Sequence, residues 1–237
     1  SISSFSSAFV LMGCIVLFLL LLSTLSFKPR SVIHKAKVKA LSIKSKLIEV
    51  RFIIFFIAGV LLQISFGPYY GFFALFLRDL DYPGFAVGLF VSIGVLAEII
   101  VFIFVSRFFK RYSLKVILIF SLAVTALRWL LMALYADFAW LLAFTQLLHA
   151  ASFALFHSAS MAFICIHFSP CQQSRGQAVY LGGVYGLGGA IGAYIAGLLW
   201  NDGLGATNTF LAASIMSLLA ACLMSFLPNA NNKKAQL

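Results

Sequence analysis

Long apolar runs separated by polar connections dominate this chain. Seven of the runs have about the 20-residue length that a helix needs to cross a bilayer. They cover residues 8–27, 52–77, 85–109, 114–136, 138–163, 178–200 and 209–226. Most connections are short, and two of them carry turn signals, Asp-Tyr-Pro-Gly at 81–84 and Asn-Asp-Gly at 201–203. The pattern predicts an all-α fold, a polytopic membrane helical bundle with seven spans.

Composition and charge fit this class. Charged residues make up only 10% of the chain, whereas soluble domains carry about 25%. The net charge of +11 raises the possibility of nucleic-acid binding. The basic residues, however, gather in alternate connections, which is the positive-inside pattern of cytoplasmic loops. We therefore expect a lipid bilayer and no nucleic acid as partner, with the N-terminus outside and the C-terminus in the cytoplasm.

The long polar connection at 28–50 divides the chain. We expect residues 1–27 to hold the last span of an N-terminal half, 28–50 a basic cytoplasmic central loop, 51–228 a six-helix half, and 229–237 a cytoplasmic tail. The span count is odd, and the chain begins at Ser1 without Met. These features suggest the back half of a twelve-span transporter plus one preceding span, with the N-terminal half missing.

Two opposite charges lie midway along apolar runs. Glu98 is central in 84–109, and Arg128 is central in 114–136. A charge at the bilayer centre costs about 2.5–3.5 kcal/mol on insertion scales and commonly marks a substrate or proton path. We expect Glu98 to carry a proton, with Arg128 as its counter-charge and as the anchor for a substrate carboxylate. A fixed structural ion pair is the alternative.

The fifth run holds two histidines near its middle, His149 and His157. On a regular α-helix, eight residues correspond to about 80° of rotation and about 12 Å of rise. One metal ion would not reach both, so we expect no metal and no cofactor. Gln146 and Ser152 share a similar face with His149. We expect His149 to take part in proton coupling, and Gln146 and His157 to contact substrate, with a packing role as the alternative for His157.

The second run contains Gln63 and then Gly67-Pro68-Tyr69-Tyr70-Gly71. Proline removes a backbone hydrogen bond, so this segment predicts an interrupted helix. Interrupted helices line transporter sites. Gln63, Tyr69 and Tyr70 are therefore candidate substrate contacts, with a simple kink as the alternative.

The sixth run is rich in glycine. Gly182 with Gly186, and Gly188 with Gly192, form two GxxxG pairs. Small residues let helix backbones approach closely in lipid. We expect these four glycines to pack against a neighbouring helix.

Several motifs occur in an order and spacing that resemble the major facilitator superfamily, and most of all the branch that holds the 3-phenylpropionate permease. They are Tyr69-Tyr70-Gly71-Phe72, Gly88-Leu89-Phe90, Gly94-Val95-Leu96-Ala97-Glu98, Arg128-Trp129, Gln146-Leu147-Leu148-His149 and Gln177-Ala178-Val179-Tyr180. The resemblance implies proton-coupled symport of a small organic solute across a bacterial inner membrane. It makes an aromatic carboxylate a candidate substrate.

A looser likeness links the chain to lactose permease. Arg128 and His149 match residues of that protein, but its lysine and its proton-carrying glutamate are replaced here by Gln146 and Ser152. Glu98 is therefore the remaining carboxylate for a proton site. We expect a transporter rather than an enzyme. The alternative is a non-transporting membrane helical module, either a truncated product or a partner subunit.

Overall fold

The computed structural model describes residues 14, 17, 18, 21, 22 and 43–228. Most of the predicted first span at 8–27, most of the loop at 28–50 and most of the tail at 229–237 lie outside the described residues. The chain divides into two units, residues 1–39 and 40–237. The second unit carries the helices described below.

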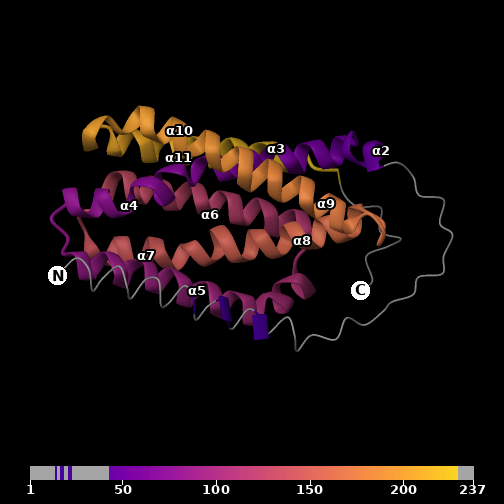
Figure 1. The fold of residues 1–237 in the computed structure, drawn as a ribbon, viewed down its shortest axis with the longest axis horizontal. Helices are drawn as coiled ribbons and strands as arrows, with labels where there is room; N and C mark the ends of the chain where they lie inside the picture. The colour runs from indigo at the N-terminus through magenta and orange to yellow at the C-terminus, as the bar shows by residue number, and fades with distance from the viewer. Residues whose placement is uncertain (1–13, 15–16, 19–20, 23–42, 229–237) are drawn as a thin grey trace. The chain divides into compact units, whose positions relative to one another are not determined.

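Six helical segments within 43–228 are long and apolar enough to cross a membrane. Three of them are single helices, namely α5 (Gly84–Arg111), α6 (Leu114–Tyr135) and α11 (Ala206–Ser225). The others are composite: α3 (Val50–Ser65) with α4 (Gly67–Asp79), α7 (Ala139–Ala150) with η1 (Ala151–Leu155) and α8 (Phe156–His167), and α9 (Gln173–Tyr180) with η2 (Leu181–Gly188) and α10 (Gly189–Trp200). Figure 1 shows them aligned along one direction. The prediction of an all-α membrane bundle is confirmed.

The connections follow the predicted turn signals. Asp81 and Asn201 adopt left-handed backbone angles, with φ of 60° and 46°. Asn201 opens a short 3-10 turn, η3 (Asn201–Gly203), before α11. The Tyr82 hydroxyl donates to the carbonyl of Ala136 at 3.0 Å, which ties two connections at the same end of the bundle. Burial raises the pKa of the Tyr82 phenol, and the charge of Asp137 raises it further.

The interrupted helix that Pro68 predicts is present. Helix α3 ends at Ser65, Phe66 stands between the two helices, and Pro68 lies in the first turn of α4. Proline is well tolerated in a first turn because that N–H needs no partner there. The interruption places Phe66 and Tyr69 on the inside of the bundle, where both are buried.

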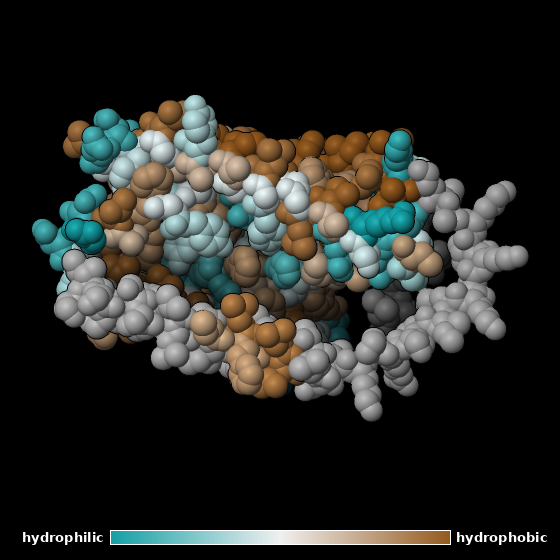
Figure 2. Space-filling model, viewed as in Figure 1, coloured by the Kyte–Doolittle hydropathy of each residue, from teal (hydrophilic) through white to brown (hydrophobic). Residues whose placement is uncertain are grey.

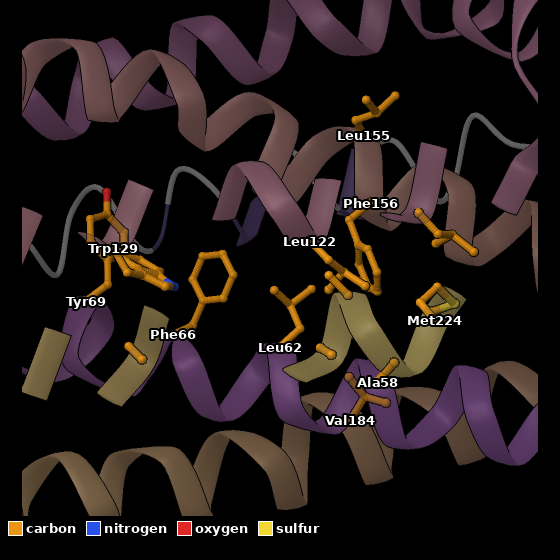
Figure 3. Packing of buried hydrophobic residues seen from close by; sticks show 14 of the residues in the cluster. Ala58, Leu62, Phe66, Tyr69, Leu122, Trp129, Leu155, Phe156, Val184 and Met224 are labelled. Carbon is orange, nitrogen blue, oxygen red and sulfur yellow. The ribbon is translucent and has the colours of Figure 1, made fainter. Parts of the chain in front are cut away.

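Aromatic side chains dominate the packing between helices. Figure 3 shows Phe66, Tyr69 and Trp129 gathered beside Leu62. Phe66 and Trp129 meet edge to face with ring centroids 5.2 Å apart, a preferred geometry for ring pairs. Nearer α8, Phe55 stacks on Phe163 at 4.0 Å. These rings hold α3, α4, α6 and α8 together.

The two glycine pairs of the sixth run have different surroundings in the structure. A Cβ at Gly188 would lie 3.2 Å from Cβ of Gln63, and a Cβ at Gly192 would lie 2.6 Å from the carbonyl oxygen of Ile64. These two glycines let α10 and α3 approach closely. Gly182 has no atom of another helix within 4 Å, and Gly186 meets only the backbone of its own turn. Both face away from the helices of the described bundle.

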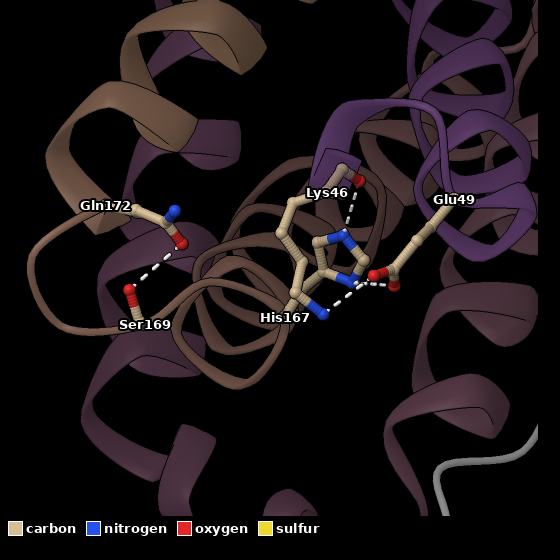
Figure 4. Close-up of polar contacts among 5 residues, drawn as sticks. All are labelled: Lys46, Glu49, His167, Ser169 and Gln172. Atoms are coloured by element: carbon tan, nitrogen blue, oxygen red, sulfur yellow. Dashed lines mark hydrogen bonds and ion pairs between the residues drawn. The ribbon is translucent and has the colours of Figure 1, made fainter. Parts of the chain in front are cut away.

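A polar cluster fastens α2 (Ile43–Leu47) to the end of α8. The Nε2 atom of His167 lies 2.9 Å from the carbonyl oxygen of Lys46, and its Nδ1 lies 3.8 Å from a carboxylate oxygen of Glu49. Lys46 also forms an ion pair with Glu49 at 2.7 Å. Figure 4 shows these contacts and a separate bond from Ser169 to Gln172. The chain entering α3 is thereby positioned against α8.

The surface separates polar ends from an apolar belt. On the face in Figure 2, brown residues cover the upper edge over α3 and α10, and teal residues gather at the ends of the bundle. Pale and teal residues also follow the middle of this face. Helix α5 exposes many large apolar side chains, as expected for a helix that contacts lipid tails.

The glycine contacts predict a contrast between two alanine substitutions. Gly192→Ala should lower the melting temperature of the purified 237-residue chain by several degrees. The added methyl would press on the backbone of Ile64, and such overpacking costs about 1–3 kcal/mol, or about 2–4 °C per kcal/mol at this size. Gly182→Ala is the matched control and should leave the melting temperature unchanged or slightly raised. Equal effects at the two positions would contradict the close approach of α10 and α3.

Candidate functional site

Arg128 lies at the centre of the described bundle with its side chain fully buried. Its guanidinium carbon lies 4.3 Å from the ring centroids of both Tyr69 and Trp129. Its Nε donates to the carbonyl oxygen of Thr145 at 3.0 Å. Cation–π contacts and a backbone carbonyl thus take the place of water around the charge.

Glu98 pairs with His149 in this structure. Glu98 Oε1 lies 2.6 Å from Nε2 of His149, which joins α5 to α7. None of the ion pairs found within the described residues joins Glu98 to Arg128. The expected counter-charge for Glu98 is therefore replaced here by an imidazole, because the guanidinium of Arg128 is held against α7 and the aromatic rings. Gly94 of α5 faces the same imidazole, and a Cβ there would lie in ordinary contact with the ring at 3.4 Å.

Gln146 connects three helices. Its Oε1 accepts a hydrogen bond from the Tyr69 hydroxyl at 3.1 Å and lies 3.5 Å from Nη2 of Arg128. Its amide nitrogen donates to the Thr145 hydroxyl at 3.1 Å. Gln146 is fully buried, so these contacts satisfy groups that would otherwise be costly in lipid. The polar cluster therefore spans α4, α5, α6 and α7, and we call it the central cluster: Tyr69, Glu98, Arg128, Gln146 and His149.

The cluster has unused hydrogen-bonding capacity. Nη1 of Arg128 and Nδ1 of His149 are buried and have no hydrogen-bond partner within the described residues. Buried polar atoms without a partner are uncommon in native structures and call for an explanation, such as a bound water, an ion or a functional role. Both atoms belong to side chains that the sequence nominates for substrate or proton binding.

Two of the candidate residues lie apart from this cluster. Tyr70 is 59% exposed and stacks on Phe66 at 5.5 Å, so it stands at the margin of the cluster. Gln63 is buried against Gly188 and Gly189 on the other side of α3. Of the three candidate substrate contacts in the second run, only Tyr69 therefore belongs to the central cluster.

His157 belongs to a second polar group. Its Nδ1 lies 3.0 Å from the hydroxyl of Tyr185. Phe153 stacks between His149 and His157, with centroid distances of 5.9 Å on each side. The two histidines thus share one face of the helix, although regular α-helical winding predicts a separation of about 80°. The π-helical turn η1 lies between them and changes the rotation per residue.

Sequence reasoning missed a chain of hydroxyl and indole groups next to Arg128. The Trp129 indole donates to the Ser65 hydroxyl at 3.1 Å, and Ser217 donates to the same oxygen at 2.9 Å. Ser65 is the last residue of α3 and Ser217 lies in α11. A single serine in an apolar run gives no distinct signal, so only the structure reveals this link.

Within the described residues no group of three or more His, Cys, Asp or Glu is placed to hold a metal ion. Six span-length helices carry a cluster of buried Arg, Gln, Tyr and His side chains with a partly buried Glu, and together they define a multi-pass membrane protein with a polar site inside its bundle. Residues 2–212 match the MFS_1 like family. The chain therefore belongs to this family of the major facilitator superfamily.

Two further similarities agree with this assignment. A probable 3-phenylpropionic acid transporter of Escherichia coli (strain K12) is 35% identical over 140 residues, which cover 59% of this chain and 36% of that protein. A crystal structure of a mutant of the nucleoside transporter NupG superposes with a TM-score of 0.72 at 21% identity, covering 92% of this chain and 60% of that one. The structural likeness concerns the fold alone. The matched part of the curated relative is little more than a third of its length.

The environment of Arg128 predicts a stability test. Arg128→Met should leave the melting temperature unchanged or raised, because it removes a buried charge that has no acidic partner in the described structure. Trp129→Phe is the comparison variant on the same helix. It should lower the melting temperature by several degrees, because it leaves space in the core and removes the donor to Ser65. A fall for Arg128→Met as large as that for Trp129→Phe would mean that Arg128 serves the fold.

Proposed function

We propose that this chain is part of a secondary transporter that carries a small organic solute together with protons. The observation that carries this proposal is the central cluster itself. It holds a buried imidazole, a buried guanidinium and a partly buried carboxylate inside a bundle of apolar helices. Charges are costly at membrane depth, and proteins that keep them there commonly use them for transport.

Arg128 is the proposed anchor for a carboxylate. Its Nη1 has no partner within the described residues, and a guanidinium can bind a carboxylate through two parallel hydrogen bonds. The rings of Phe66, Tyr69 and Trp129 surround the guanidinium. An aromatic carboxylate would meet both a charge and aromatic surface there. The name of the curated relative, a probable 3-phenylpropionic acid transporter, supports this substrate class.

Glu98 and His149 are the proposed proton site. At 2.6 Å, one atom of the Oε1–Nε2 pair must hold a hydrogen that the other accepts. A proton added at this pair would be shared between the carboxylate of Glu98 and the imidazole of His149, which both belong to the central cluster. An anionic substrate bound at Arg128 would change the charge beside Glu98 and His149. Substrate binding and proton binding would thereby be coupled.

The chain is proposed to act with an N-terminal half in a bacterial inner membrane. In transporters of this kind the substrate site lies between two halves, near the midplane. The described helices would form one wall of it. A non-transporting membrane module remains the alternative function, and loss of transport in the variants below would argue against it.

Substitutions in the complete transporter test the two roles separately. Glu98→Gln should abolish proton-driven accumulation while exchange of substrate across the membrane continues, because the substrate anchor is intact. Glu49→Gln is the matched control, since this carboxylate lies at the start of α3 and outside the central cluster. Uptake and exchange of radiolabelled 3-phenylpropionate in vesicles measure both effects. Proton-dependent accumulation by Glu98→Gln would remove Glu98 from the coupling role.

Arg128→Ala should impair both accumulation and exchange. A hydrogen bond to a charged group contributes about 1.5–3 kcal/mol, so binding of 3-phenylpropionate should weaken about tenfold to a hundredfold. The neutral amide of 3-phenylpropionate should compete for binding much less well than the acid in the parent protein. In Arg128→Ala, the amide and the acid should compete equally well. Equal competition by the acid and the amide in the parent would exclude a carboxylate anchor. Strong competition by a nucleoside would favour a neutral substrate.

Membrane orientation is tested by labelling. Single cysteines at Lys110 and Asp202, introduced after replacement of Cys14, Cys165, Cys171 and Cys222, should react with an impermeant maleimide from opposite sides. Lys110 should be reached from the cytoplasm, because basic residues concentrate at that end. Labelling of both positions from one side would contradict the proposed topology.

A further inference from the structure

Two adjoining cavities open where the end of α5 meets the start of α6. The first has a volume of about 270 Å³ and an apolar lining, made by Phe108, Tyr112, Val116, Ile117, Phe120 and Leu155. The second has a volume of about 310 Å³ and is lined by Phe104, Arg107, Phe108, Arg111 and Tyr112. Phe108 and Tyr112 line both cavities, which therefore adjoin, and we call the two together the α5–α6 groove.

The groove runs from the end of the bundle into the depth of the membrane. Phe120 lies six residues beyond the first residue of α6, a rise of about 9 Å. Ile117 and Leu155 form a buried floor, whereas Val116 and Phe120 are half exposed along the side. A space of this form, apolar and open laterally, suits an extended hydrocarbon chain that lies along the helices.

Cations surround the outer end of the groove. Arg107 and Arg111 lie one turn apart on α5, with guanidinium carbons 4.6 Å from the ring centroid of Phe104 and 5.6 Å from that of Tyr112. Lys110 and Lys115 lie nearby in the sequence, and no acidic residue occurs between Glu98 and Asp137. None of the four basic residues takes part in an ion pair within the described residues. Among the described residues, these four positive charges are therefore not neutralised by ion pairs.

We propose that the α5–α6 groove binds an anionic phospholipid, with one acyl chain in the apolar cavity and the phosphate between Arg107 and Arg111. Basic pockets between membrane helices are suited to acidic lipid headgroups, and the guanidinium fork matches phosphate oxygens. A free anion would use the arginines but leave the apolar cavity empty. An apolar protein segment would fill the cavity but leave the arginines unpaired. Only an amphipathic anion uses both parts, and the site is independent of the proposed transport function.

Lipid retention tests the charged part of the site. The 237-residue chain is purified in mild detergent with equal amounts of phosphatidylglycerol and phosphatidylcholine, and bound lipids are counted by native mass spectrometry. The parent chain should retain phosphatidylglycerol in preference. Arg107→Gln with Arg111→Gln should reduce that preference at least about tenfold, since each basic residue contributes about fivefold. Lys44→Gln with Arg175→Gln removes the same charge elsewhere and should retain the preference. Equal losses in the two double variants would overturn the site.

Filling the groove tests the apolar part. Val116→Trp should displace phosphatidylglycerol, whereas Leu127→Trp, on an exposed position of the same helix, should not. Unchanged retention in Val116→Trp would overturn the proposal. So would full displacement of the lipid by glycerophosphoglycerol, which has the headgroup without the chains. In the complete transporter, a photo-reactive residue at Val116 should cross-link to lipid, and a cross-link to another part of the protein would show that the groove is a protein interface.

Discussion

A polar group buried within a bilayer has no water to bind, so it must find its partners inside the protein. The described helices are arranged around this constraint. Arg128 turns one donor to a backbone carbonyl and its flat face to the rings of Tyr69 and Trp129. Gln146 then links Arg128 to α4 through Tyr69. The aromatic packing next to the cluster therefore serves two purposes, since it fills the core and shields a charge.

The interruption of the second span depends on the same constraint. Ser65, the last residue of α3, has a hydroxyl that accepts from Trp129 and from Ser217. Restarting the helix at Gly67 brings Tyr69 toward Gln146. A continuous helix would present different side chains to α6 and α7. The broken helix is thus one of the features that position the candidate site, together with the pairing of α5 and α7 through Glu98 and His149.

Sequence reasoning predicted the spans because a helix in lipid must be apolar for its whole length, and this leaves a strong pattern. It also singled out Glu98, Arg128, Gln146 and His149 as candidates, since a charged, amide or imidazole side chain stands out in such a run. It could not determine which of them touch. The pairing of Glu98 with His149, the separate position of Gln63 and the outward direction of Gly182 depend on helix rotation. Ser65 and Ser217 escaped notice because hydroxyl groups are tolerated widely in membrane helices.

Helix rotation in the fourth described span is altered by the π-helical turn η1. A π turn holds more residues than an α turn, because its hydrogen bonds join residues five apart. The rings of His149, Phe153 and His157 consequently form one stack, with neighbouring planes inclined by 16° and 11°. The alignment of His149 and His157 thus depends on the number of residues in the turn between them and not on which residues these are. On a regular α-helix, residues seven apart lie about 20° from one another around the axis, so the π turn lets the span hold one more residue between the histidines while both stay on one face.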